Sequence, residues 1–339
     1  MDVRDENSTS NFHEKENKND RSLHFMTCLE IPVHLFGAYC IIFKTPSSMK
    51  SVKWTMLNLH FWSVLLDLTI SLFTSPYVLF PTLVGRSLGV LEKFGVPTEI
   101  QLYLIVTLFP TVGVSITAIL ENRYYLLFAR DGLWKYFRIP FLTSLYLSSF
   151  FCFLPSYLDI PDQREAMEEV LKTMPEILDY TLDGKMFVLS TDFHEFFWTL
   201  VIMIGLVTGT SVTFARILLK NMKKRSRLIN VSPQTLQIQK IFFQAISVQT
   251  SMPILILIVP ISYLAISMLT GYFNQAANNL CFIITAFHGL FSTSIMITVH
   301  KPYRDVFNSM FCERIRRIFL HTESRITYSM SVISMTTRV

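Results

Sequence analysis

Residues 58–73 read NLHFWSVLLDLTISLF and place one carboxylate, Asp67, near the middle of a strongly apolar run. The polar residues of this run recur at intervals of three and four, which puts them on one face of a helix. They are His60, Ser63, Asp67, Ser71 and Thr74. A charged side chain at the centre of a bilayer costs about 2.5–3.5 kcal/mol, so it normally faces the interior of a helix bundle. The stretch therefore predicts a membrane-spanning helix with an inward-facing polar stripe.

The whole chain has the composition of a membrane protein. Of its 339 residues, 51% are hydrophobic and 16% are charged, whereas soluble domains carry about 25% charged residues. A bilayer core of about 30 Å needs about 20 apolar residues of helix to cross it. Seven such runs occur, at about 22–43, 54–80, 99–128, 137–157, 194–219, 241–270 and 274–299. They predict an all-α membrane protein: a tail at 1–21, a seven-helix bundle at 22–299 and a further segment at 300–339.

The distribution of charge predicts how the bundle is oriented. Of the 30 Lys and Arg residues, 21 lie after spans one, three, five and seven, and basic residues are retained on the cytoplasmic side during insertion. The loop 158–193 instead carries nine acidic residues. We therefore expect the N-terminus outside and the C-terminus inside. No nucleic-acid partner is expected, because the net charge of +5 is explained by this asymmetry of basic residues. Asn7, in Asn7-Ser8-Thr9, is then a candidate glycosylation site.

Polar stripes in two further spans suggest where a ligand binds. The candidate ligand-binding residues are Thr107, Thr111 and Ser115 in span three and Asn278, Thr285 and His288 in span seven. His60, Asp67 and Ser71 are candidates for an intramembrane polar switch or ion site, with a purely structural polar network as the alternative. Glu30 and His34 are four residues apart in span one, and we expect water to solvate them near its outer end. No metal site and no cofactor are predicted.

The segment after span seven alternates apolar and charged residues at helical spacing. Residues 300–320, HKPYRDVFNSMFCERIRRIFL, therefore predict an amphipathic helix lying on the inner membrane surface, in contact with lipid. Cys312 within it is a candidate lipidation site.

Two stretches of the sequence are distinctive: residues 32–71, PVHLFGAYCIIFKTPSSMKSVKWTMLNLHFWSVLLDLTIS, and residues 300–307, HKPYRDVF. Both resemble the nematode serpentine chemoreceptors of class H. The resemblance implies a G-protein-coupled receptor for an external small molecule or peptide, in the plasma membrane of chemosensory neuron endings. The rhodopsin-type NPxxY sequence is absent from span seven, where residues 299–303 read VHKPY.

Such a receptor would meet a heterotrimeric G protein through the inner ends of its helices. Span three ends in LENRYYLLFAR, residues 120–130, with Glu121 and Arg123 at the boundary. An arginine that simply extends its head group to the interface would look the same. The loop after span five adds the basic residues Lys223, Lys224, Arg225 and Arg227.

Other functional classes fit the sequence less well. A ligand-gated channel and a transporter stay as alternatives, although no internal repeat of the kind many transporters carry is visible. The chain contains neither HExxH nor GxSxG, so an enzyme is not predicted.

Overall fold

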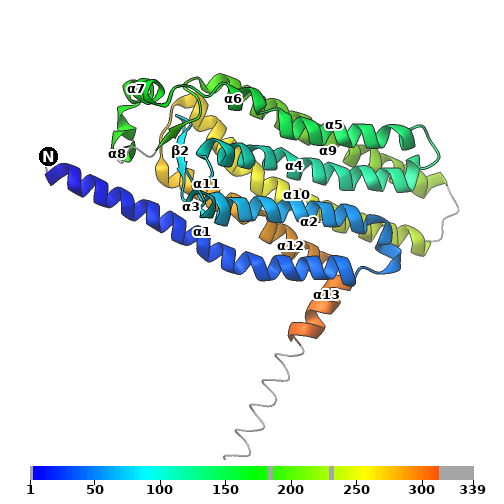
Figure 1. The fold of residues 1–339 in the computed structure, drawn as a ribbon. Helices are drawn as coiled ribbons and strands as arrows, with labels where there is room; N and C mark the ends of the chain where they lie inside the picture. Colours follow the sequence, from blue (N-terminus) through cyan, green and yellow to red (C-terminus); the bar gives the residue numbers. More distant parts are fainter. Residues whose placement is uncertain (1–2, 182–185, 229–232, 313–339) are drawn as a thin grey trace, which may run out of the picture.

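A computed structural model describes residues 3–181, 186–228 and 233–312 of the chain. Within these residues, seven helices are long and apolar enough to cross a membrane, which confirms the predicted seven-helix bundle. The spans are Leu23–Phe43, Lys50–Thr74, Thr98–Ala129, Trp134–Leu158, Phe193–Lys224, Ser247–Thr270 and Gln275–Val299. Figure 1 shows them lying side by side along one common direction.

The long helices account for most of the structure. They are α1 (Val3–Phe43), α2 (Lys50–Leu68), α4 (Thr98–Tyr124), α5 (Trp134–Phe151), α9 (Phe193–Leu228), α10 (Pro233–Thr270), α11 (Gln275–Ala286) and α12 (His288–Val299). π-Helical turns extend α2 through Thr74 and α4 through Ala129, and the short α6 (Leu154–Leu158) follows α5. Residues 1–21, expected as a separate tail, are helical from Val3 and continue directly into span one, with Asn7 inside α1.

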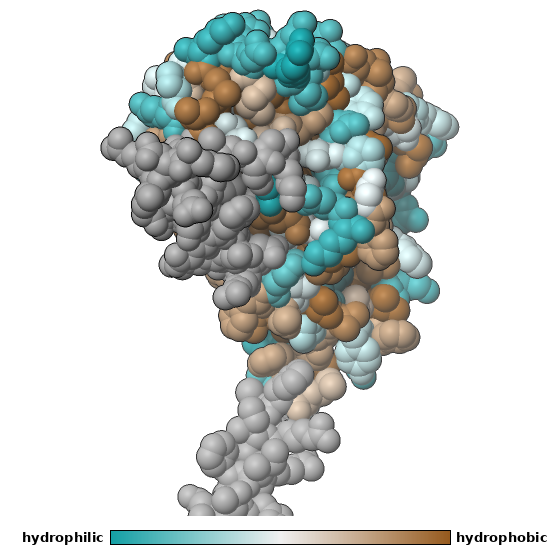
Figure 2. Space-filling model, turned by 60° about the vertical axis from the view of Figure 1, so that its left-hand side comes forward, coloured by the Kyte–Doolittle hydropathy of each residue, from teal (hydrophilic) through white to brown (hydrophobic). Residues whose placement is uncertain are grey.

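α4 is the central helix of the bundle. It packs against α2, α5 and α9, and its residues from Val114 to Asn122 are all buried. Helices α5 and α9 instead expose many large apolar side chains, such as Phe137, Leu147 and Ile202. An apolar surface of this kind suits contact with lipid. Figure 2 shows hydrophobic residues reaching the flanks of the molecule and hydrophilic residues gathering along its upper edge.

One end of the bundle carries a small antiparallel sheet that the sequence did not predict. Its strands are β1 (Pro76–Leu79), β2 (Val84–Ser87) and β3 (Phe187–Val188), in the order β1-β2-β3. Span two, expected to run to Phe80, ends its helix at Thr74, and Ser75 (φ 40°) turns the chain into β1. We call this the sheet end. The opposite end, with the loops 44–49 and 130–133, is called the basic end.

The acidic loop between spans four and five folds onto the sheet. Its helix α7 (Gln163–Thr173) is capped by the Asp162 carboxylate, which accepts from the amides of Arg164 and Glu165 at 3.1 and 3.2 Å. The apolar side of α7 packs Ala166 and Val170 against buried residues of the strands. The short elements η4 (Pro175–Ile177) and α8 (Leu178–Thr181) follow, and α3 (Val90–Lys93) joins β2 to α4.

Candidate functional site

Asp67 of α2 caps the N-terminus of a neighbouring helix in the bundle interior. Span seven is broken at Phe287, between α11 and α12. Such a break leaves the first amides of the second half without partners in the preceding turn. Asp67 is fully buried, and its Oδ1 and Oδ2 accept from the amides of Gly289 and Leu290 at 2.9 and 3.0 Å. A carboxylate also interacts favourably with the positive end of a helix dipole. The carboxylate in the apolar run therefore joins span two to span seven.

Gly289 allows this close approach. A Cβ atom built on Gly289 would lie 2.4 Å from Asp67 Oδ2 and 2.8 Å from Asp67 Cγ. Real Cβ atoms do not come so close, so any side chain here displaces the carboxylate from the α12 amides. By contrast, a Cβ on Gly205 of α9 would meet nothing within 4 Å.

We expect Gly289→Ala to destabilise the protein by about 1–3 kcal/mol, the usual cost of forcing extra volume into a packed interior. Gly205→Ala is the matched control, and alanine in place of an open helical glycine is worth about 0.5–1 kcal/mol in the stabilising direction. Thermal unfolding of the two purified variants measures the difference. An unfolding temperature for Gly289→Ala equal to that of Gly205→Ala would contradict the close contact with Asp67.

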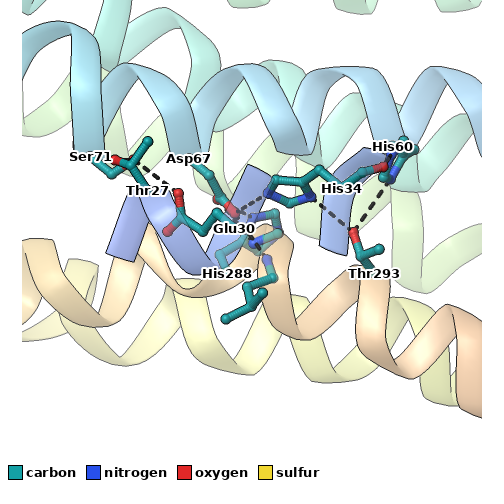
Figure 3. A network of polar contacts seen from close by, with 10 residues as sticks. Thr27, Glu30, His34, His60, Asp67, Ser71, His288 and Thr293 are labelled. Atoms are coloured by element: carbon teal, nitrogen blue, oxygen red, sulfur yellow. Dashed lines mark hydrogen bonds and ion pairs between the residues drawn. The ribbon is translucent and has the colours of Figure 1, made fainter. Parts of the chain in front are cut away.

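Polar side chains from spans one, two and seven surround Asp67 and form what we call the polar cluster (Figure 3). Its members are Glu30, His34, His60, Asp67, Ser71, His288 and Thr293. His34 Nε2 lies 3.3 Å from Asp67 Oδ2, and His288 Nδ1 lies 3.7 Å from Asp67 Oδ1. Glu30 and His34 are 0% and 4% exposed, so the expectation that water solvates them was wrong. They lie deep because α1 packs directly on α2 and α12.

Hydrogen bonds hold the outer members of the cluster. Ser71 Oγ donates to Glu30 Oε2 at 2.9 Å, and Thr27 Oγ1 donates to Ser71 Oγ at 3.0 Å. His34 Nδ1 lies 3.2 Å from Thr293 Oγ1, and His60 Nε2 lies 3.0 Å from the His34 carbonyl oxygen. The three residues predicted as a switch or ion site, His60, Asp67 and Ser71, therefore come together, with Glu30 and His34 added from α1.

The six predicted ligand-binding residues do not line one common site. Thr111 Oγ1 lies 3.0 Å from Ser149 Oγ of α5, and Ser115 accepts from Tyr146 of α5 at 3.3 Å. The remaining four lie at separate places. Thr107 bonds the Tyr103 carbonyl of its own helix, Asn278 donates to the Phe80 carbonyl at 3.1 Å, Thr285 lines an apolar cavity, and His288 joins the polar cluster.

The apolar cavity has a volume of about 90 Å³ and lies beneath the β1–β2 hairpin. Val78 and Phe80 of the hairpin segment form its roof, and spans three, five, six and seven form its walls. The wall residues include Val106, Phe109, Leu200, Ile261, Met268, Phe282 and Thr285. A deeper cavity of about 240 Å³ between spans three, five and six shares Phe109, Leu200 and Ile261 with it. Sequence reasoning missed both cavities, because their apolar linings resemble lipid-facing helix surface.

Glu121 forms a buried ion pair at the basic end. Its carboxylate is 0% exposed, pairs with Arg138 at 3.0 Å and accepts from Trp134 Nε1 at 2.7 Å. The Arg138 guanidinium also lies 3.9 Å from the centre of the Tyr125 ring, within the range of a cation–π contact. Neither Arg138 nor Trp134 was singled out from the sequence, although both stand in the short loop and helix that follow span three.

His300 links the end of span seven to span six. Its Nε2 donates to Gln249 Oε1 of α10 at 2.9 Å. Burial, and then the nearby charge of Arg123, lowers the pKa of His300 to about 4, so the ring is neutral at physiological pH. Lys223 and Lys224 are exposed at the end of α9, whereas the side chains of Arg225 and Arg227 lie outside the described residues.

Helix α13 (Lys301–Phe307) turns away from the bundle at the basic end (Figure 1). Its Tyr303 is fully buried and its hydroxyl lies 2.7 Å from Thr45 Oγ1, whereas Phe307 and Met310 are exposed. The π-helical turn η5 (Asn308–Cys312) follows. The rest of the predicted amphipathic helix and the side chain of Cys312 lie outside the described residues.

Comparisons with known proteins agree with this architecture. The family model for the serpentine type 7TM GPCR chemoreceptor Srh matches residues 15–313. Serpentine receptor class H-72 of Caenorhabditis elegans is 27% identical over 302 residues, which cover 84% of this chain and 82% of that protein. The crystal structure of squid rhodopsin matches with a TM-score of 0.53 and 10% identity over 89% of this chain and 87% of that chain, a likeness of fold alone. The chain therefore belongs to the Srh family of serpentine seven-helix G-protein-coupled chemoreceptors.

Proposed function

We propose that this receptor sits in the plasma membrane of chemosensory neuron endings with its sheet end outside, and binds a small, largely apolar external molecule in the cavity beneath the β1–β2 hairpin. The observation that carries the proposal is the cavity itself. Four spans and the hairpin meet there, so a bound molecule would touch several elements that can move relative to one another. The asymmetry of Lys and Arg supports this orientation, because the loops at the sheet end are poor in basic residues.

The chemistry of the cavity favours an apolar ligand. Its walls are aliphatic and aromatic side chains, with Thr285 and Cys281 as the polar contribution. The Thr285 hydroxyl donates to the Cys281 carbonyl at 2.8 Å, which leaves its lone pairs able to accept one hydrogen bond from a ligand. The cavity of about 90 Å³ is smaller than an engineered apolar cavity of about 150 Å³ that binds benzene. A compact volatile molecule that also uses part of the deeper cavity of about 240 Å³ fits this space best.

The same proposal assigns the basic end to a heterotrimeric G protein. Lys223 and Lys224 are exposed there, Arg225 and Arg227 follow them in α9, and Arg123 lies at the end of span three. Glu121 has a different part in this proposal. Its pairing with Arg138 and Trp134 sets the conformation of the loop between spans three and four, which borders the same surface. Binding at one end then favours binding at the other through a shared change in helix arrangement.

Filling the cavity is expected to impair ligand detection without impairing the fold. Val106→Phe adds a ring at the cavity wall, so we expect the concentration of an active cue needed for half-maximal response to rise at least tenfold. Cells expressing the receptor with a panel of Gα subunits, challenged with pooled volatile and water-soluble cues, provide the calcium or cAMP readout.

Val201→Phe is the matched control, because Val201 is 38% exposed on α9 and lines neither cavity. We expect it to respond like the wild type. Equal potency for the two variants at equal surface expression would place the ligand elsewhere, and a response that needs no Gα subunit would count against the receptor function itself.

A further inference from the structure

Three buried side chains bring metal-ligating atoms together beside the break in span seven. Glu30, His34 and Asp67 each place one oxygen or nitrogen atom within 4.8 Å of the other two. All three are nearly inaccessible, with exposures of 0%, 4% and 0%. His288, also at 0%, brings its Nδ1 to 3.7 Å from Asp67 Oδ1. Two carboxylates and one imidazole from α1 and α2 therefore converge in the interior, and the His288 ring of α12 lies beside Asp67 at the edge of this group (Figure 3).

Several atoms in this group that could bind a metal have no hydrogen-bond partner. They are Glu30 Oε1, His34 Nε2 and both ring nitrogens of His288. His34 Nε2 lies 3.3 Å from Asp67 Oδ2 but lacks the geometry of a hydrogen bond. Leaving a buried polar atom without a partner costs about 1–3 kcal/mol. Glu30 Oε1, His34 Nε2 and His288 Nδ1 belong to side chains gathered around Asp67, which indicates that another group satisfies them.

The remaining atoms of the same side chains are held in the manner of metal ligands. Ser71 fixes Glu30 through Oε2, and Thr293 contacts His34 at Nδ1, so Oε1 and Nε2 are the atoms turned to the centre. Ligating histidines commonly bond a second group through the other ring nitrogen, which fixes the tautomer and the ring. The α12 amides hold Asp67 at one lone pair of each oxygen, and each oxygen has a second lone pair to offer.

The charge of the cluster favours a cation. Among the residues that the structure describes, no Lys or Arg forms an ion pair with Glu30 or Asp67. Buried carboxylates are stable only when they are paired, protonated or bound to a metal. A divalent ion would neutralise both carboxylates at once.

The oxygen and nitrogen ligands in this group determine which class of metal ion the site prefers. Mg²⁺ and Ca²⁺ prefer all-oxygen sites, whereas imidazole with carboxylate suits Zn²⁺ and its transition-metal neighbours. Ligands about 2.0 Å from a tetrahedral ion lie about 3.3 Å from one another, which is the distance found between His34 Nε2 and Asp67 Oδ2. We propose that Glu30, His34 and Asp67, with His288 as the fourth ligand after a small shift of its ring, bind one divalent transition-metal ion that clamps spans one and two to the start of α12.

The test uses the purified full-length receptor in lipid nanodiscs after treatment with a chelator, with zinc and cobalt(II) as probes. We expect one tight zinc site per chain, a higher unfolding temperature when zinc is present, and the visible absorption bands of tetrahedral cobalt(II). His34→Gln is expected to weaken zinc binding by at least tenfold, because even outer contacts of metal sites are worth about 10–100-fold in affinity. His194→Gln, an exposed histidine on α9, is expected to bind zinc as the wild type does.

Two results would overturn the proposal. One is a wild-type receptor that binds no zinc tightly and gives no tetrahedral cobalt spectrum. The wild-type measurement needs no variant, so a misfolded substitution cannot leave the question open. The other is His34→Gln with the zinc affinity of the wild type, since binding would then occur on surface groups. In either case a proton held by Glu30 would be the better account of the cluster.

Discussion

Asp67→Ala is expected to lower surface expression of the receptor at least tenfold and to lower its unfolding temperature more than any other single substitution in span two. The substitution removes the acceptors of the Gly289 and Leu290 amides. Each buried amide left without a partner costs about 1–3 kcal/mol, and no water replaces the lost bonds inside a bilayer. Loss of about 1.4 kcal/mol already changes a folding equilibrium tenfold.

Ser63→Ala is the matched control for Asp67→Ala. Ser63 lies one turn away in α2, is 1% exposed, and its hydroxyl has no hydrogen-bond partner, so its removal is expected to be neutral or mildly stabilising. Asp67→Asn keeps one acceptor oxygen and should fall between the two. Flow cytometry of tagged receptors and thermal unfolding give the comparison. Wild-type behaviour of Asp67→Ala in both assays would reject the capping role, and a defect that persists in chelator separates capping from metal binding.

Arg138→Met is expected to destabilise the basic end by about 3–5 kcal/mol, the usual cost of removing one partner from a buried ion pair. The Glu121 carboxylate would stay buried at the end of α4 and, among the described residues, would keep the Trp134 indole as its side-chain hydrogen-bond donor. The Arg138 contacts with Asn122 at 3.2 Å and with the Tyr125 ring would be lost as well. Methionine keeps the apolar stem of the side chain, so the charge is the main change.

Thermal unfolding of the purified receptor measures this effect, with Lys135→Met as the control. Lys135 is exposed in the same first turn of α5, and its removal should cost little. The double variant Glu121→Gln with Arg138→Met should recover part of the loss, because the unpaired buried charge is gone. If Arg138→Met unfolded at the same temperature as Lys135→Met, the ion pair would contribute nothing to the stability of this end.

The bundle could be predicted because its signals are local in the sequence. Long apolar runs give the spans, and the three- and four-residue spacing around Asp67 places it on the inner face, where it is found fully buried. What Asp67 does there could not be predicted. Its hydrogen-bond partners depend on the break at Phe287. Residues 284–288, ITAFH, contain neither proline nor glycine that would indicate a helix break.

The sequence at the sheet end contains a signal for the end of span two. The predicted span runs across Ser75-Pro76 and up to Phe80-Pro81, although proline is a poor continuation of a helix. Pro76 begins β1, Pro81 lies in the turn that follows it, and Gly85 lies within β2, where it pairs with Val78 of the cavity roof. The depth of Glu30 and His34 has no comparable signal, because burial of α1 side chains depends on how closely α2 and α12 pack beside them. The cavity walls have none either, since an apolar lining and a lipid-facing surface use the same residues.

The break at Phe287 divides span seven into two segments that meet at a hinge. The first segment, α11, is attached to the hairpin through Asn278 and the Phe80 carbonyl and carries Thr285 at the cavity wall. The second segment, α12, is attached to Asp67 and ends at His300 beside α10. Because Asp67 already supplies the acceptors for the first α12 amides, the angle between the two segments can change without breaking a continuous series of helical hydrogen bonds. A molecule that shifts the hairpin by a small amount would therefore tilt α11 at little cost, while Asp67 keeps the start of α12 in place.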